Sequence, residues 1–154
     1  MKTIRTLLTF ILIASIISAC SKEKRTSYVK MRMTDAPGDY LEVNVDIQEV
    51  RIKYSEEDSW ETVPTYTGIY NLLEFQNGNF FVLAPTYELP EGSIGQIRLI
   101  LGPNNTVTLK DSTVHALKTP SAEQSGLKLN VHQYLPPNDT VNLLLDFDAD
   151  ASVA

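Results

Sequence analysis

The chain has 154 residues, of which 43% are hydrophobic and 21% charged, and its 19 acidic residues outnumber its 13 basic ones. This composition is typical of one globular domain and excludes a largely disordered chain. The acidic balance excludes a nucleic-acid-binding protein, whose surface would be basic.

The N-terminus has the features of a bacterial lipoprotein leader. The apolar run Leu7–Ile17 is far shorter than the ~20 residues of a membrane-spanning helix, but it suits a secretory signal peptide. The residues Ile17-Ser18-Ala19-Cys20 then resemble a lipobox, and Cys20 is the only cysteine, so it cannot form an intramolecular disulfide. We therefore predict that residues 1–19 are removed and that fatty acyl chains such as palmitate on Cys20 anchor the protein to a membrane.

The anchor is expected to be the lipid alone. Loss of Lys2 and Arg5 with the leader reduces the 13 basic residues to 11, against 19 acidic ones, so no polybasic surface remains to bind lipid headgroups. Residues 20–27 form a polar tether, and its seven residues after Cys20 span only ~25 Å when fully stretched. The domain is thus predicted to lie close to a bacterial envelope membrane, with the outer membrane expected and either of its faces compatible.

Residues 28–154 are predicted to form one all-β domain. Tyr28–Thr34 alternates between apolar and polar residues, as a half-buried strand does. The Ala36–Asp39 sequence predicts a type II turn, with proline at its second position and glycine at its third. Leu41–Tyr54 is a long strand whose apolar phase slips by one near Gln48-Glu49, which predicts a β-bulge or a strand that crosses between sheets. Trp60–Val63 is expected to return as the second strand of a hairpin.

Shorter strand patterns continue to the end of the chain, separated by turn sequences such as Leu89–Gly92. Ile69–Phe75 is too short to predict a helix. The further predicted strands are Phe80–Ala84, Ile94–Leu101, Thr106–Lys110, Val114–Leu117, Leu127–Val131 and Val141–Asp150. About nine short strands without a helical pattern predict a two-sheet antiparallel β-sandwich rather than a barrel.

Three stretches carry a resemblance to a known family: Met33–Pro37, Thr119–Leu129 and Leu145–Val153. Together with the long alternating strand they resemble bacterial envelope lipoproteins built on a domain of unknown function. The resemblance covers about Val29 to Val153. It implies a β-sandwich of the prealbumin-like, immunoglobulin-like or carbohydrate-binding-like kind, with no established activity. Family members continue into a further strand, so the domain is expected to lack a final strand and to leave one sheet edge unpaired.

An acidic row near the C-terminus is a candidate Ca²⁺ site. If Val141–Asp150 is a strand, three carboxylates project from one face, ~6.6–7 Å apart. A cation could lie over such a row. The interpretation that we favour is a solvated strand face with the intervening apolar residues packed inward. The three acids are Asp146, Asp148 and Asp150.

The polar loop Lys118–Gly126 is a candidate binding loop. It is longer than a tight hairpin requires, and strands are expected to hold it at both ends. Its candidate contact residues are Gln124 and Ser125, with Lys128 just beyond it. The alternative is a simple connector. If the loop lies beside the Asp146–Asp150 strand end, the two segments form one site.

Five aromatic residues would make a platform for sugar rings if they were exposed together, although we favour core and half-buried positions for them. They are Trp60, Tyr66, Tyr70, Tyr87 and Tyr134. The two histidines, His115 and His132, lack metal-ligand spacing and are expected to be structural or to face solvent. The sequence contains no nucleophile elbow and no phosphate-binding loop.

These patterns predict a non-catalytic, lipid-anchored envelope module without a resident cofactor that binds a glycan or a protein. The alternative is a Ca²⁺-stabilised structural or adhesive subunit.

Overall fold

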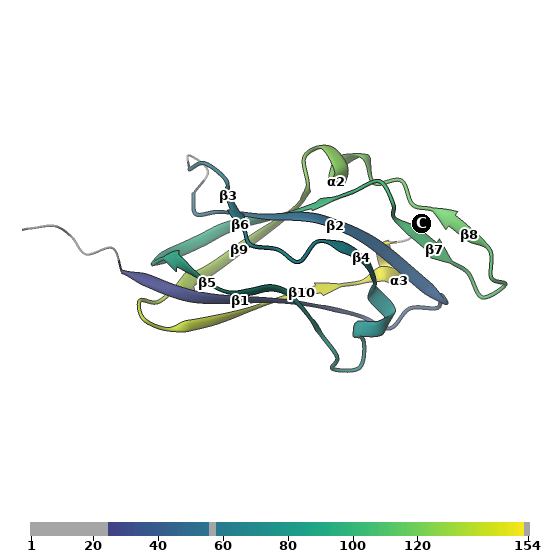
Figure 1. The fold of residues 1–154 in the computed structure, drawn as a ribbon, viewed down its shortest axis with the longest axis horizontal. Coiled ribbons are helices and arrows are strands. Elements are labelled where there is room, and N and C mark those ends of the chain that lie inside the picture. The colour runs from purple at the N-terminus through teal and green to yellow at the C-terminus, as the bar shows by residue number, and fades with distance from the viewer. Residues whose placement is uncertain (1–24, 56–57, 153–154) are drawn as a thin grey trace, which may run out of the picture.

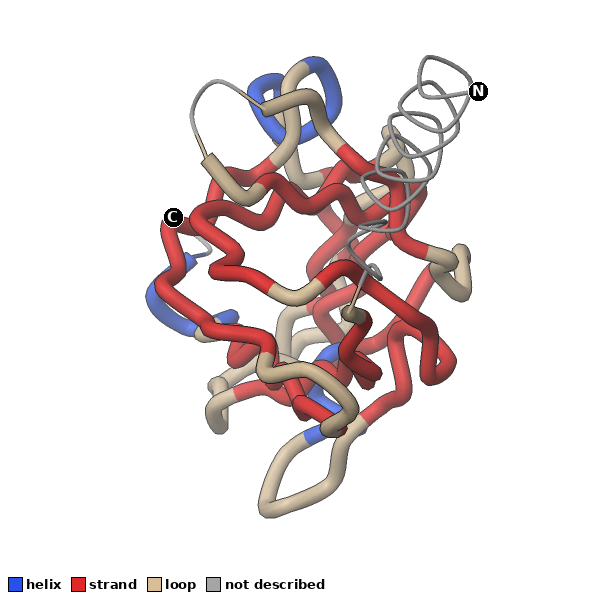
Figure 2. Tube along the Cα trace, turned by 90° about the vertical axis from the view of Figure 1, so that its left-hand side faces the viewer, coloured by secondary structure: helices blue, strands red, loops and turns tan. Residues whose placement is uncertain are grey.

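The computed structural model describes residues 25–55 and 58–152. They form ten strands in two sheets that lie face to face, with short helical turns in the connections and after the last strand (Figure 1, Figure 2). The predicted all-β sandwich is confirmed. The predicted signal peptide, residues 1–19, and the predicted lipidation site, Cys20, lie outside the described residues.

The smaller sheet has three strands, in the order β10 (Thr140–Phe147), β1 (Thr26–Asp35) and β5 (Phe81–Pro90). In β1 the predicted alternation is confirmed, because its three inward-facing residues are fully buried. These residues are Val29, Met31 and Met33. The strand begins two residues earlier than predicted, which shortens the tether. Ser27 tolerates burial because its hydroxyl donates a hydrogen bond to the carbonyl oxygen of Asp139, at 3.2 Å.

One strand pair in this sheet is parallel, where antiparallel pairing was predicted. β10 lies parallel to β1 from the pair Tyr28 and Thr140 to the pair Asp35 and Phe147. The connection before β10 returns the chain to the start of β1, where the Tyr28 N–H donates to the Asp139 carbonyl oxygen at 2.8 Å. The last strand therefore enters beside the first and runs in its direction.

The larger sheet has seven strands. Five follow the order β8-β7-β2-β6-β9, and β3 and β4 also pair with β2. The bounds are β2 (Glu42–Lys53), β3 (Glu61–Val63), β4 (Gly68–Asn71), β6 (Gly92–Leu101), β7 (Thr106–Thr108), β8 (Val114–Ala116) and β9 (Leu127–Leu135).

Strand β2 contains the predicted irregularity. Val43, Val45 and Ile47 are buried in one phase, and Val50 and Ile52 in the next. The pairing with β6 shifts register between residues 47 and 49, so the predicted bulge is confirmed. The predicted hairpin is also confirmed, because β3 pairs antiparallel with β2.

Two connections differ from the predicted turns. Gly38 does not have the positive φ that a type II turn requires at its third position, so Ala36–Asp39 is not such a turn. At Leu89–Gly92 the chain passes from the smaller sheet to the larger one, with Glu91 alone between β5 and β6. Gly92 has φ 147°, and a Cβ there would lie 3.2 Å from the Tyr54 ring, so glycine suits this sharp corner.

Three helical segments are short. They are the 3₁₀ turn η2 (Leu72–Phe75), α2 (Pro120–Gln124) and α3 (Ala149–Ser152). Asn71 caps η2, since its side-chain oxygen accepts the Leu73 N–H at 3.2 Å. No helix in residues 25–55 and 58–152 is long and apolar enough to cross a bilayer.

The two ends of the sandwich are built differently. At the closed end, which contains the start of β1 and residues Leu89, Ile94 and Leu135, these three side chains are at most 1% exposed. At the open end, β1 and β10 both stop, and loops and helical turns replace the sheet edges (Figure 1). The ten residues of β1 separate the two ends by ~33 Å.

Candidate binding pocket

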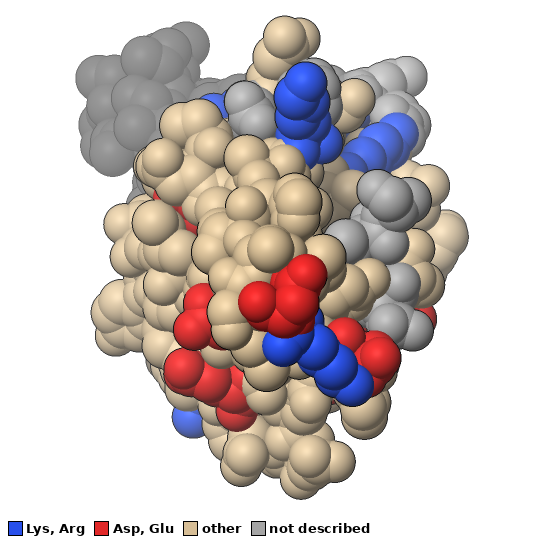
Figure 3. All heavy atoms as spheres, turned by 90° about the vertical axis from the view of Figure 1, so that its right-hand side faces the viewer, with Lys and Arg blue, Asp and Glu red and all other residues tan. Residues whose placement is uncertain are grey.

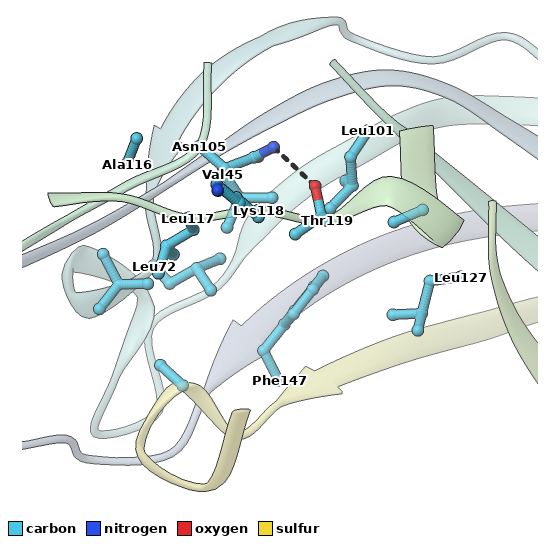
Figure 4. A pocket seen from close by; sticks show the side chains of 13 residues that line it. Val45, Leu72, Leu101, Asn105, Ala116, Leu117, Lys118, Thr119, Leu127 and Phe147 are labelled. Carbon is cyan, nitrogen blue, oxygen red and sulfur yellow. Dashed lines mark hydrogen bonds between the residues drawn. The ribbon is translucent and has the colours of Figure 1, made fainter. Parts of the chain in front are cut away.

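An apolar cavity of about 600 Å³ lies at the open end (Figure 4). The larger sheet contributes Val45 and Leu101 to its wall. Leu72 of η2 and Phe147 at the end of β10 line it as well, and Leu117 extends the wall beyond β8. Ten of the thirteen lining residues are apolar. A cavity of this size is within the ~300–1,000 Å³ range of small-molecule sites.

The turn between β6 and β7 forms the polar part of the wall. Asn105 is only 1% exposed. Its Oδ1 accepts the Asp46 N–H at 2.8 Å, and its Nδ2 donates to the Gly102 carbonyl oxygen at 2.6 Å and to Thr119 Oγ1 at 3.1 Å (Figure 4). This amide therefore joins β2, the turn and the segment before α2, which holds the pocket wall in place.

The same turn depends on a glycine. The Gly102 N–H donates to the Asp46 carbonyl oxygen at 2.7 Å, and a Cβ at position 102 would lie 2.6 Å from the Asp46 Cγ. The buried Asp46 carboxylate also accepts the Asn104 side-chain amide at 2.9 Å. Only glycine allows this close approach, so the turn sequence Gly102–Asn105 sets the position of the wall.

A second buried carboxylate ties the C-terminal segment to the pocket. Asp35 is 4% exposed, and its side chain accepts the Ala149 N–H at 3.0 Å and the Gln76 side-chain amide at 3.1 Å. Burial raises the pKa of the Asp35 carboxyl above its ordinary value, against the lowering effect of these two hydrogen bonds. Asp35 thereby fixes Ala149, a lining residue, beside η2.

The predicted binding loop, Lys118–Gly126, closes one side of the pocket. It contains α2, which begins at Pro120 and ends at Gln124, and the N–H of the next residue, Ser125, donates to the Ser121 carbonyl oxygen at 2.9 Å. Gly126 has φ 82°, and a Cβ there would lie 2.6 Å from Ile100 Cδ1, so the loop packs closely against β6. The loop residues that line the cavity are Lys118, Thr119 and Ala122, and Leu127 follows them.

The predicted contact residues of this loop do not line the cavity. Gln124, Ser125 and Lys128 are exposed and lie outside the set of lining residues. Ser125 serves the loop itself, because its hydroxyl donates to the Ser121 carbonyl oxygen at 3.0 Å. Sequence reasoning selected the polar residues of the loop and missed the apolar ones, such as Ala122, that face the pocket.

The acidic row does not form, and the strand on which the Ca²⁺ prediction depended is wrong. β10 ends at Phe147 because its partner β1 ends opposite it, at Asp35. Asp148 then accepts the Ala151 N–H at 2.9 Å and starts α3, so Asp146, Asp148 and Asp150 do not share a strand face. Among the residues that the structure describes, no group of three His, Cys, Asp or Glu side chains is placed to hold a metal ion. The apolar residues that alternate with the acids face inward, with Leu145 and Ala149 buried and Phe147 partly buried.

The loop and the C-terminal segment nevertheless meet. Lys118, Thr119 and Ala122 line the same cavity as Phe147 and Ala149. The two segments that the sequence singled out thus form one site, although they do so through different residues from those predicted.

The five candidate aromatic residues do not gather around this site, and none of them lines it. The Trp60 ring is covered by the Arg98 guanidinium, 4.3 Å from its centroid. Tyr70 packs on Phe81 at 4.4 Å between centroids, and its hydroxyl donates to the Tyr66 carbonyl oxygen at 3.0 Å. His115 on β8 and His132 on β9 are both exposed, which is one of the two positions expected for them.

Residues 26–154 match the family described as "Domain of unknown function (DUF4382)". The chain belongs to this family. The match confirms the predicted membership of a family built on a domain of unknown function. It begins at the first residue of β1, so this DUF4382 domain comprises both sheets and the pocket. No curated protein matches the chain.

Proposed function

We propose that this DUF4382 protein is a lipid-anchored binding module of the bacterial outer membrane, and that its open-end pocket takes an apolar group of its ligand or partner. The observation that carries the proposal is the position of the pocket. β1 begins at Thr26, a few residues after Cys20, and runs ~33 Å to Asp35 beside the pocket wall. Acyl chains on Cys20 would hold the closed end at the membrane, and the pocket would face away from it.

The chemistry of the lining supports binding rather than catalysis. The polar lining residues are Asn105, Lys118 and Thr119. The only hydroxyl among them is on Thr119, and within the described part of the chain the lining contains no histidine or carboxylate, the usual bases that activate a hydroxyl. An apolar wall with a few polar groups is the usual form of a ligand site.

The pocket is tested with the neutral fluorescent dye 1-aminoanthracene and the intact acylated protein in lipid nanodiscs. Partition of the dye into lipid is the same for every variant, so differences between variants report the pocket. We expect saturable binding to the wild type and its loss in Ala122→Trp, whose indole would fill the cavity. Ser93→Trp places the same ring on an exposed position near the closed end and is the matched control.

A second variant keeps the test valid if Ala122→Trp does not fold. Leu127 lines the mouth and is 45% exposed, so Leu127→Asp puts a charge there at little cost to folding. It should weaken dye binding as well. Equal dye binding by the wild type, Ala122→Trp and Leu127→Asp would refute the pocket as the binding site.

The anchor is tested by the mass of the mature N-terminal peptide from the native host. We expect Cys20 at the N-terminus with acyl chains attached, and Cys20→Ser should lack them. An unmodified Cys20 thiol in wild-type protein would refute the anchoring part of the proposal.

A further inference from the structure

The buried amide of the pocket wall, on Asn105, is already hydrogen-bonded within the protein. Both amide hydrogens of Asn105 are donated, to the Gly102 carbonyl oxygen and to Thr119 Oγ1, and its Oδ1 accepts the Asp46 N–H. These hydrogen bonds occupy the side-chain groups of Asn105 that could otherwise bind a ligand. A ligand body with hydroxyl groups would lose its water without gaining partners there.

The remaining wall of the pocket is apolar and favours a hydrocarbon ligand. Leu72, Leu101, Leu117, Leu127 and Phe147 come from five different segments and surround the cavity (Figure 4). Such a lining disfavours a glycan, one of the two predicted ligands, since a sugar presents a hydroxyl group on most of its carbons. It favours an extended aliphatic chain, because the transfer of each methylene group from water into the cavity lowers the free energy of binding.

One charge stands at the mouth. Lys118 is the only charged lining residue, and it is exposed, so it lies where the cavity meets solvent. None of the ion pairs between described side chains involves Lys118. The open end is otherwise mostly neutral, with its acidic and basic side chains in small groups (Figure 3). An ammonium at the rim of an apolar cavity complements a ligand that is aliphatic along its body and anionic at one end.

We infer that the pocket binds a free fatty acid of medium chain length, with its acyl chain in the cavity and its carboxylate at the Lys118 ammonium. This inference rests on the proposed function and names the class of its ligand. Affinity should rise about fourfold with each added methylene until the cavity is full, as expected for burial of CH₂ groups.

The experiment measures displacement of 1-aminoanthracene by laurate and by dodecanol, below their aggregation concentrations, from nanodisc-held wild type, Lys118→Gln and Lys30→Gln. Comparing the variants for each ligand removes the effect of its partition into lipid. We expect Lys118→Gln to weaken laurate about fivefold, as for a partly exposed charge pair, and to leave dodecanol unchanged. Lys30→Gln makes the same charge change on β1, outside the set of lining residues, and should alter neither ligand.

The outcomes separate this inference from the proposed function. If the dye binds and Ala122→Trp abolishes its binding, but laurate does not displace it, the fatty acid is wrong and the pocket stands. Equal weakening of laurate and dodecanol by Lys118→Gln would also overturn the role of the carboxylate. Failure of the dye to bind the wild type would overturn both proposals.

Discussion

The closed end and the open end of this sandwich are formed by the same two sheets but differ in how the space between the sheets is packed. At the closed end, Leu89, Ile94 and Leu135 fill the space between the sheets and are at most 1% exposed. At the open end, a cavity of about 600 Å³ remains between walls that are equally apolar. Protein interiors are normally packed without voids of this size. The difference supports the proposal that the open end is a binding site, while the closed end is a packed core.

The ends also differ in what holds them. Both ends have backbone hydrogen bonds between strands and connections, such as Asn138 N–H to the Thr26 carbonyl oxygen at the closed end, at 2.7 Å, and Ala36 N–H to the Phe147 carbonyl oxygen at the open end, at 2.9 Å. The open end also contains three buried polar side chains, Asp35, Asp46 and Asn105. Buried polar groups of this kind fix a wall that cannot be held by packing across an empty space.

A pair of leucine truncations should separate the two ends most strongly. Leu135→Ala at the closed end should lower the free energy of unfolding by ~4 kcal/mol, because it opens a cavity in a filled core. Leu72→Ala at the open end should cost only ~2 kcal/mol, since one side of Leu72 already borders a cavity. Denaturant titration measures both. The two leucines are 0% and 2% exposed, so burial is matched. Equal costs would mean that the open end is as tightly packed as the closed one.

Removal of the Asn105 amide should have the next largest effect. Asn105→Ala loses three hydrogen bonds and leaves the buried Asp46 N–H without its acceptor, so we expect a loss of ~2–3 kcal/mol. An exposed asparagine on β10 that does not line the pocket provides the control, and Asn142→Ala should cost less than ~1 kcal/mol. The comparison uses the same titration. If the two variants are equally stable, the turn network does not support the wall.

The smallest expected effect is a pH dependence at Asp35. The pKa of its carboxyl is raised in the folded protein, so the folded state holds the proton more tightly than the unfolded state does. The contribution of Asp35 to stability is therefore most favourable when the group is protonated, and it declines as the pH rises from the ordinary pKa of 3.8 through the raised pKa. Asp35→Asn has no such titration.

The measurement is the difference in unfolding free energy between the wild type and Asp35→Asn at several pH values. The wild type should lose stability relative to Asp35→Asn as the pH rises through that window. A difference that moves in favour of the wild type would show that the hydrogen bonds from Ala149 and Gln76 outweigh burial.

Sequence patterns predicted the strands better than the site. The alternation in β1 and the phase slip in β2 report which side chains face inward, and local sequence determines that property. The parallel pairing of β10 with β1 depends on where the chain returns after β9, which no strand pattern encodes. The Asp146–Asp150 alternation also looked like a strand, but a strand needs a partner, and β1 offers none beyond Asp35.

The pocket could not be predicted because its wall is assembled from residues 43 to 149. Its loop residues belong to no recognisable binding motif, and an alanine such as Ala122 does not by itself indicate a ligand site. The turn Gly102–Asn105 offered one clue, since it places two asparagines after a glycine between two strands. Polar residues of that kind are buried only when the fold satisfies them, as it does for Asn105.

The open-end pocket is tested most directly by a methyl NMR titration of the intact protein in nanodiscs with 1-aminoanthracene, with the leucine methyl groups labelled. We expect the resonances of Leu72, Leu101, Leu117 and Leu127 to shift and saturate together. Those of Leu89 and Leu135 should stay in place. Unchanged resonances at the open end, or equal shifts at both ends, would contradict the claim that the open end is a ligand-binding pocket.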